Sequence, residues 1–524
     1  MYLAQRMGRL LATEIRRELA VRQGRTAREA AGRQRAQAVR QGLEDLGPFW
    51  IKIGQMLATR PDLMPQTVLD ELEVLHDRIE PEPFASFEPV LVGDLGADWR
   101  EQFKDIETDR PLGAASLAQT YRAVMPDGQD AVVKIQRPGT RKVVTADMAV
   151  LRRLARTISK RAPKFSALVD VEAMLNVIFD AMEPELDFTL EAKNMERARA
   201  CAEEFEHLSI PEVILATEHV LVQSLAPGRS IRDAKPEEFS EDERLAIGQD
   251  LMAFMYKGFF NDRFFHADPH PGNIFVEPGK GATIIDWGMT GRMDRSLSST
   301  ILLLFFQMAN NDGAAVASTW ISLGHPTAWA QPLAFEDDMA NFVPKIASAS
   351  LDELNFGVSL TAILQFSTKR GIRVNPAIAI LGKAFGNVEG AVRCLCPDIV
   401  ITDVLEDEIQ EIIFGLVRDL LSEKQYACNT LEMMHAAPTL MRKTQGLLDS
   451  LTNNEFTLRT VERKDPQTVL AEAAAARSRN RRRALLAATA FVLWKLRSNK
   501  ATLPQPLIPL YTPCRWGLRP AGPR

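Results

Sequence analysis

The stretch FFHADPHPGNIF, residues 264 to 275, holds two histidines, an aspartate and an asparagine between apolar residues. His266, Asp268 and His270 alternate along it and are possible ligands of a zinc-type metal ion if the segment stays extended. The Asp-Pro and His-Pro-Gly steps favour a turn, whose polar groups either satisfy the backbone or take part in catalysis. A metal site, a structural turn and a catalytic loop are therefore the three interpretations of this stretch.

Residues downstream favour the catalytic loop. Four residues separate Asp268 from Asn273, and Asp286 follows the β-type run of IIDWG. This order resembles the protein-kinase elements H-R-D-x-x-x-x-N and D-F-G. Phosphoryl transfer from ATP needs Mg2+ to neutralise the phosphates, and Asn and Asp supply the hard oxygen ligands that this ion prefers. We predict that Asn273 and Asp286 bind Mg2+ and that Asp268 acts on the acceptor, with His266 and His270 in structural or supporting roles.

Two upstream residues complete the set of polar groups that a kinase-like site needs. The string AVVKIQRPG offers Lys134 as a strand lysine for the phosphates, and LEAKN offers Glu191 as a helix acid to hold that lysine. Alone, Lys134 is typical of a strand lysine with a solvated end group, and Glu191 of a solvated helix acid. In chain order with Asp268, Asn273 and Asp286 they predict an ATP site in which Lys134, Glu191 and Asp268 are catalytic.

The elements that must position these residues can be read from the hydrophobic pattern. Helical spacing dominates the first hundred residues, whereas two β-prone runs around a turn at Pro126 to Gly128 predict a hairpin. Helices are predicted at 143–158, 171–200 and 242–260, and strands at 219–224 and 282–285. From Ser298 to about Asp449 the pattern is largely helical. A β-rich segment followed by a hinge and a helical segment is the order of a two-lobed nucleotide-binding enzyme.

Composition limits the class of protein. The chain has 524 residues, 46% hydrophobic and 25% charged, which is enough for two or more cores. The net charge of -5 argues against a nucleic-acid partner. Five cysteines without CxxC spacing and an N-terminus without a signal-peptide pattern predict a cytoplasmic protein in a reducing compartment.

The C-terminal tail carries one apolar segment with basic flanks. Residues 484 to 494, ALLAATAFVLW, are too few to cross a bilayer as a helix. Two interpretations remain: a helix lying on an anionic membrane surface, peripheral on its inner face, or a helix docked on the protein itself. The Pro-rich sequence that follows predicts an extended or disordered end.

Six strings together resemble the UbiB/AarF family of atypical protein-kinase-like proteins. They are LGPFWIKIGQMLATRPDLMP, PLGAASLAQTYRA, AVVKIQRPG, ELDFTLEAKN, FFHADPHPGNIF and IIDWGMTGRM, from about Leu46 to at least Met293. The resemblance implies an α+β, two-lobed protein-kinase-like fold with an N-terminal helical extension and a mostly helical C-lobe. The expected divisions are a helical extension at 1–100, an N-lobe at 101–225, a C-lobe at 226–449 and a basic, partly amphipathic, Pro-rich tail at 450–524.

In that family the KIGQ element, here with Lys52, Gly54 and Gln55, lies on a helix that resembles a lid over the site where a protein kinase binds its peptide. The resemblance makes Lys52 the expected partner of Glu185 and Asp187 in ELD. Without it, Lys52 is typical of a surface lysine on an amphipathic helix. A lid at this place disfavours a peptide substrate.

The resemblance also assigns the nucleotide site. An alanine-rich loop replaces the glycine-rich loop of ordinary kinases, and the hinge lies in LVQSLAPG; the residues expected to bind nucleotide, beside Lys134, are Gly113, Ala114, Ala115, Ser116, Ser224 and Leu225. Three positions depart from the usual patterns. Gly113 stands where Ala is common in the family, Ser224 stands where Glu is common, and Ala267 replaces the arginine beside the catalytic aspartate of kinases.

Three functions are compatible with these features. The first is an ATPase or a small-molecule or lipid phosphotransferase with ATP and Mg2+, resembling proteins that support isoprenoid-quinone (ubiquinone) biosynthesis. Its expected partners are a quinone precursor or lipid and an anionic membrane surface. The alternatives are a protein kinase acting in trans and a nucleotide-dependent, non-catalytic scaffold of a membrane-associated complex.

Overall fold

The chain divides into two units, residues 1–449 and 450–524, and the part described here lies in the first. The apolar segment at 484–494, for which a membrane-surface helix and a helix docked on the protein are both expected possibilities, lies outside it. The computed structural model describes residues 28–58, 66–76, 80–161, 175–176, 179, 182–183, 185–327, 329–347, 356–375, 377–397, 399 and 401–420.

The N-terminal lobe is built on an antiparallel sheet with the order β1-β3-β4-β7-β6, in which β2 pairs with β3. The hairpin predicted around Pro126 to Gly128 is confirmed as β3 and β4, with Thr120 opposite Lys134. The strands of this sheet are β1 (Asp105–Ile106), β2 (Gly113–Ala114), β3 (Ala118–Val124), β4 (Asp130–Gln136), β6 (Val213–Ala216) and β7 (Val220–Ser224).

The two faces of this sheet pack against different helices. Side chains alternate along a strand, so Val220 and Val222 of β7 join the core beneath α5 (Glu88–Leu95), whereas Leu221 joins the core that includes α9 (Phe188–Ala202). Lys134 lies between Val133 and Ile135, which face the α5 side. The alternation therefore directs Lys134 toward α9.

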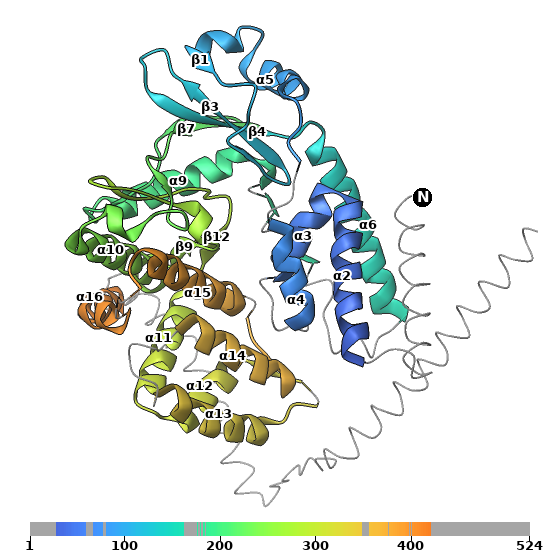
Figure 1. The fold of residues 1–524 in the computed structure, drawn as a ribbon. Helices are drawn as coiled ribbons and strands as arrows, with labels where there is room; N and C mark the ends of the chain where they lie inside the picture. The colour runs from blue at the N-terminus through green and yellow to red at the C-terminus, as the bar shows by residue number, and fades with distance from the viewer. Residues whose placement is uncertain are drawn as a thin grey trace, which may run out of the picture. The chain divides into compact units, whose positions relative to one another are not determined.

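The N-terminal extension is a group of helices that packs beside the sheet. Its helices α2 (Arg28–Leu46), α3 (Pro48–Ala58) and α4 (Gln66–Glu73) contact one another, and Figure 1 shows this group on the same side of the sheet as the long α6 (Thr140–Arg161). Phe49, Trp50 and Ile53 of α3 share a core with Val144 of α6 and with Leu117, which lies just before β3. Trp50 Nε1 also donates to Asp147 Oδ2 at 3.0 Å.

The C-terminal lobe is mostly helical. Its helices are α10 (Glu241–Phe260), α11 (Arg295–Ala309), α12 (Gly313–Leu323), α13 (Pro332–Ala347), α14 (Phe356–Lys369), α15 (Ala377–Leu395) and α16 (Ile401–Leu420). The short strands outside the N-terminal sheet are β5 (Leu208–Ser209), β8 (Arg229–Ser230), β9 (Phe264–His266), β10 (Ile274–Glu277), β11 (Gly281–Ile284), β12 (Thr290–Arg292), β13 (His325–Pro326) and β14 (Ile372–Arg373). The predicted α+β class is confirmed, the helix expected at 242–260 is present as α10, and the largely helical pattern expected from Ser298 is present as far as the described residues extend, to Leu420.

The lengths of the helices bear on membrane insertion. Within the described ranges, every helix is too short or too polar to pass through a bilayer.

Candidate active site

Lys134 contacts two carboxylates, and the contact with Asp286 links the N-terminal lobe to the C-terminal lobe. Its Nζ lies 2.9 Å from both oxygens of Glu191 on α9 and 3.0 Å from Asp286 Oδ1 beyond β11. The Glu191 side chain is 2% exposed, whereas that of Asp286 is 46% exposed. The predicted strand lysine and helix acid are therefore an ion pair, and the structure brings Asp286 to the same lysine.

The charge states follow from this geometry. Burial lowers the pKa of Lys134, but Asp286 and Glu191 oppose this effect and together bring that pKa above its usual range. Burial raises the pKa of Glu191 to about 7, against the effect of Lys134. The charge of Lys134 outweighs partial burial at Asp286 and holds the pKa of Asp286 well below its usual range. At neutral pH Lys134 and Asp286 are both charged.

Asn273 and Asp286 are neighbours because β10 and β11 form a hairpin. Ile274 pairs with Ile284, so the residues just outside the hairpin's open end also meet, and Ile285 N donates to Asn273 O at 2.9 Å. Asp286 has φ +60°, a left-handed conformation that Asp and Asn tolerate better than most residues. This backbone turn follows directly after the buried strand and precedes the fully buried Trp287.

His266 fixes the segment that carries Asp268 to the end of this hairpin. Its Nε2 lies 3.1 Å from Ile285 O and its Nδ1 accepts from Asp268 N at 3.1 Å. The ring is fully buried and 4.8 Å from the Trp287 ring. Burial lowers the pKa of His266, so the ring is neutral and donates from Nε2 to Ile285. The supporting role predicted for His266 agrees with these contacts, since both ring nitrogens are engaged with the backbone.

His270 also has a local backbone contact. Its Nδ1 accepts from Gly272 N at 3.0 Å, at the start of the short 3-10 helix η5 (Pro271–Asn273). A zinc-type site at His266, Asp268 and His270 finds no support. Across the described ranges, no three His, Cys, Asp or Glu side chains gather in a metal-binding group.

The Asn273 and Asp286 pair still fits Mg2+. This ion is commonly held by one or two protein oxygens together with substrate phosphates, so a dedicated protein cage is not required. Asn273 Nδ2 donates to Asp268 O at 3.2 Å, so the oxygen is the atom that this side chain would offer a cation. Asp286 offers an ionised carboxylate.

The Asp268 carboxylate has two partners that the sequence reasoning missed. Lys383 Nζ lies 3.1 Å from Asp268 Oδ1, and Asn387 Nδ2 donates to the same oxygen at 2.9 Å. Both residues lie on α15. Burial tends to raise the pKa of Asp268, but Lys383 and His270 bring it below its usual range. The signal in the sequence is a polar pair at i and i+4 within the otherwise largely apolar AIAILGKAFGN.

The lid lysine reaches this group of charges from α3. Lys52 Nζ forms an ion pair with Glu185, and its side chain is 14% exposed. Burial lowers the pKa of Lys52, but the charges of Glu185, Asp286 and Asp268 together raise it. Lys52 is therefore a cation that faces the same acidic site as Lys134.

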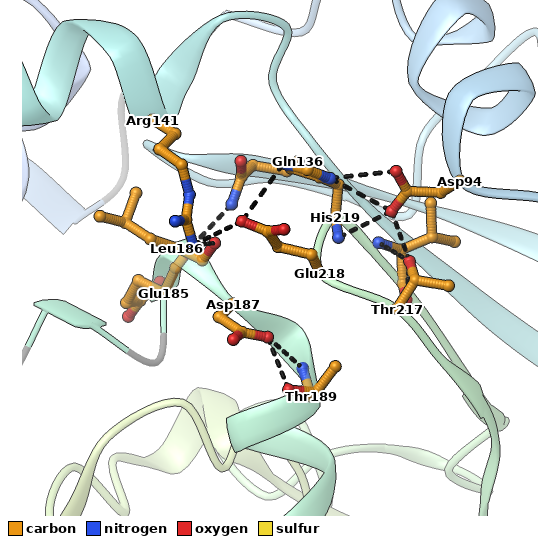
Figure 2. Close-up of polar contacts among 11 residues, drawn as sticks. Asp94, Gln136, Arg141, Glu185, Leu186, Asp187, Thr189, Thr217, Glu218 and His219 are labelled. Carbon is orange, nitrogen blue, oxygen red and sulfur yellow. Dashed lines mark hydrogen bonds and ion pairs between the residues drawn. The ribbon is translucent and has the colours of Figure 1, made fainter.

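The segment that carries Glu185 is held by its backbone. Figure 2 shows Gln136 and Arg141 directed at this segment: Gln136 Nε2 donates to Glu185 O at 3.2 Å and Arg141 Nη2 donates to Leu186 O at 3.1 Å. Arg141 also pairs with Glu218 at 2.6 Å. These bonds connect β4 and α6 to the peptide whose side chain meets Lys52.

The other residues of the KIGQ and ELD strings make local contacts. Asp187 caps α9, where its Oδ1 accepts from Thr189 N at 3.0 Å, as Figure 2 shows, so the expected pairing with Lys52 falls to Glu185 alone. Gln55 Nε2 donates to Leu75 O at 3.3 Å. A Cβ on Gly54 would lie 2.5 Å from a methyl carbon of Leu75, so glycine permits the close approach of α3 to its neighbours.

The alanine-rich loop lies between β2 and β3. Gly113 and Ala114 form β2, Ala115 N donates to Ala118 O at 2.8 Å, and Ser116 is buried. None of the residues 113–116 has positive φ, so the loop does not use the conformational freedom of Gly113.

The hinge residues are engaged within the sheet. Ser224 N donates to Glu212 O at 2.9 Å, and Leu225 N donates to Asp130 O at 3.1 Å. Ser224 Oγ accepts from Glu212 N at 2.9 Å. Adenine recognition by Ser224 and Leu225 therefore stays a prediction that concerns their carbonyl groups, because their amides already have partners.

Two family models match the chain. The model of the ABC1 atypical kinase-like domain matches residues 74–320, which include Lys134 and Asp286, and that of the UbiB helical domain matches residues 339–400, which include Lys383.

Similar proteins are found among curated sequences and solved structures. Probable protein kinase UbiB from Marinobacter nauticus is 31% identical over 402 residues, 74% of this chain and 72% of that protein. The protein of the same name from Pseudomonas putida is 30% identical over 427 residues, 80% of this chain and 77% of that protein. Among solved structures, the complex of Rv3197 with erythromycin from Mycobacterium tuberculosis is similar to this chain. The match covers 68% of this chain and 91% of that chain, with 23% sequence identity and a TM-score of 0.48.

Proposed function

Because the chain belongs to the UbiB family of atypical protein-kinase-like proteins, we propose that it is an ATP-dependent phosphoryl-transfer enzyme: an ATPase or a phosphotransferase for a small or lipid-like acceptor. One observation carries this proposal. Lys134 Nζ lies 2.9 Å from both Glu191 oxygens and 3.0 Å from Asp286 Oδ1. In kinases this lysine–glutamate pair and the metal-binding aspartate must both be in place for phosphoryl transfer.

Each residue has a role that its environment supports. Lys134, held by Glu191, orients the phosphates of ATP. Asn273 and Asp286 hold Mg2+, which when bound neutralises phosphate charge. Asp268 is ionised and accepts a hydrogen bond from the acceptor hydroxyl or water, which it orients for in-line attack on the terminal phosphorus.

The lid favours a small acceptor over a protein. Lys52 on α3 is paired with Glu185, and its charge interacts with those of Asp268 and Asp286. A protein substrate would need this helix to move and Glu185 to lose its partner, and breaking a buried ion pair is costly. A protein kinase acting in trans is therefore the less favoured function.

Measurement of phosphate release from Mg–ATP by the purified protein tests the proposal. Asp286→Asn is expected to lower turnover at least ~100-fold, because the metal supplies several kcal/mol of charge stabilisation. The left-handed backbone tolerates Asn, so the variant should fold. Asp338→Asn, which removes a carboxylate paired with Arg370 at 2.6 Å, is the matched control and should keep wild-type turnover.

Two outcomes would contradict the proposal in different ways. Equal turnover of Asp286→Asn and wild type would refute the metal-binding role of Asp286. Nucleotide binding by the wild type without turnover, with or without anionic liposomes, would favour the scaffold.

The cellular role that we propose is support of isoprenoid-quinone biosynthesis from a peripheral position at a membrane. It rests on the family and on the basic-flanked segment at 484–494. In a deletion strain, wild type should restore quinone content and Asp286→Asn should not. Restoration by both would show that the cellular role does not need phosphoryl transfer.

A further inference from the structure

The backbone of Asp268 is fixed by its own loop. Asp268 N donates to His266 Nδ1 at 3.1 Å, and Asp268 O accepts from His270 N at 2.8 Å and from Asn273 Nδ2 at 3.2 Å. All of these partners lie between His266 and Asn273, in the segment from β9 to η5. The loop therefore sets where the Cα of Asp268 lies, but these bonds do not set the direction of the carboxylate.

The carboxylate is directed by α15 instead. Lys383 Nζ at 3.1 Å and Asn387 Nδ2 at 2.9 Å converge on Asp268 Oδ1. Residues at i and i+4 share one face of a helix, so both donors approach from the same side. With one oxygen held by two donors, the direction in which Oδ2 is presented is fixed as well.

The helix that supplies these donors is firmly seated in the C-lobe core. Phe385 lies between them in sequence, is fully buried, and has its ring centroid 4.1 Å from that of Phe259 on α10. Lys383 is 24% exposed and Asp268 17% exposed, so water competes only partly for their contact. A charged hydrogen bond between partly shielded groups on a rigid support has a well-defined geometry.

We propose that Lys383 and Asn387 are positioning residues for phosphoryl transfer: they direct the Asp268 carboxylate toward the acceptor, so that the helical C-terminal segment completes the catalytic site. This inference rests on the proposed function and adds to it two residues outside the kinase-like match at 74–320. A carboxylate displaced by about 1 Å can cost ~100-fold in rate without any change in nucleotide binding.

A double-mutant cycle tests this role. Lys383→Met should lower kcat by about 100-fold while the Kd for Mg–ATP changes less than about twofold, and Lys383→Arg should recover part of the loss. In the Asp268→Asn background Lys383→Met should have little further effect, because the carboxylate that it directs is gone. Lys280→Met, which removes an exposed lysine paired with Glu277, is the control and should behave as wild type.

Losses that multiply in the double variant, or an equal loss of nucleotide affinity in Lys383→Met, would overturn the proposal. If the wild type has no turnover, the proposed function fails, and crystal structures then decide the positioning role independently. An unchanged direction of the Asp268 carboxylate in Lys383→Met with Asn387→Leu would overturn it. A reoriented carboxylate on an unchanged loop backbone would support it.

Discussion

The two acidic partners of Lys134 differ in solvent exposure, and this difference suits them to different roles. Glu191 is 2% exposed and bound through both oxygens, so it is suited to hold the lysine permanently. Asp286 is 46% exposed, ionised, and bound to Lys134 through one oxygen. It can therefore exchange a lysine contact for a cation without uncovering a buried charge, as a metal ligand next to bound phosphates must.

At the same scale, His266 makes stability depend on pH. Burial lowers the pKa of His266 below its ordinary value of 6.5. The imidazole of His266 is therefore protonated more readily in the unfolded chain than in the folded one. The free energy of unfolding should therefore fall as pH drops below about 6.5, by up to about 1.4 kcal/mol per pH unit. Chemical denaturation of wild type and His266→Gln between pH 8 and about 5 measures this, since the variant should lose that slope.

The control removes buried hydrogen bonds without a titrating group. Ser298 is fully buried and donates to Phe259 O at 3.2 Å and Phe260 O at 3.1 Å. Ser298→Ala should lower stability by a similar amount at every pH and keep the wild-type slope. An unchanged slope in His266→Gln would contradict the prediction.

At the scale of elements, the loop between β2 and β3, which we expect to bind nucleotide, is held by Arg137, the residue directly after β4. Arg137 N donates to Leu117 O at 2.8 Å and Arg137 Nε donates to Ala115 O at 3.1 Å. The other end of this buried side chain pairs with Glu82 and donates to Glu80 O at 3.2 Å. One arginine thus connects the loop to the segment that precedes α5.

We expect Arg137→Lys to weaken nucleotide binding. A lysine keeps the charge but cannot donate to Ala115 O and Glu80 O at the same time. The loop is then less ordered in the free protein, and ordering it on nucleotide binding costs free energy. The Kd for Mg–ATP, measured by calorimetry, should rise about tenfold, equivalent to ~1.4 kcal/mol. Arg122→Lys, at an exposed ion pair with Asp130 on the same hairpin, is the control and should leave affinity unchanged. Equal affinity of all three proteins would contradict a role for Arg137.

Several elements could be predicted because their signals are local. The hairpin of β3 and β4 follows from two β-prone runs around a turn, and α10 follows from an apolar helical run. The short strands β5 and β8 were missed because two residues carry no period. The helix expected at 171–200 is interrupted at Asp187, which caps α9; the described residues 175–176, 179, 182–183 and 185–186 before it are also helical.

The site was predictable only as far as its motifs extend. Lys134, Glu191, Asn273 and Asp286 stand in recognisable strings, and the structure brings them together. Lys383 and Asn387 belong to no such string, and only tertiary packing places α15 against the catalytic loop. The family and the kinase-like fold are confirmed, whereas the residue roles and the divisions at 100, 225 and 449 stay predictions.

At the scale of the whole described unit, α3, the expected lid, shares one core with the end of the loop that we expect to bind nucleotide. Leu117 is 2% exposed and packs in the same cluster as Phe49 and Trp50 of α3 and Val144 of α6. Close-packed interiors transmit displacements, so motion of the loop is resisted by α3. Ordering of one should therefore order the other.

Hydrogen exchange should detect this coupling. Addition of Mg–ATP should slow amide exchange both in residues 113–118 and in α3, although α3 itself carries no predicted nucleotide ligand. Peptides from α13, remote in the C-lobe, serve as the control and should exchange at an unchanged rate. Protection confined to residues 113–118 would contradict the coupling, because α3 would then not respond to nucleotide.

The partners of Asp268 on α15 also define what can be exchanged between relatives. Asn387 contacts Asp268 across 119 positions of chain, and it lies beyond residue 320, where the kinase-like match ends. A chimera that takes only residues 74–320 from a relative would combine the aspartate of that relative with Lys383 and Asn387 of this chain. Under the positioning role proposed above, it should be active only if the relative makes the same contact. The segment that must be exchanged as a whole is therefore longer than the domain that the sequence motifs mark.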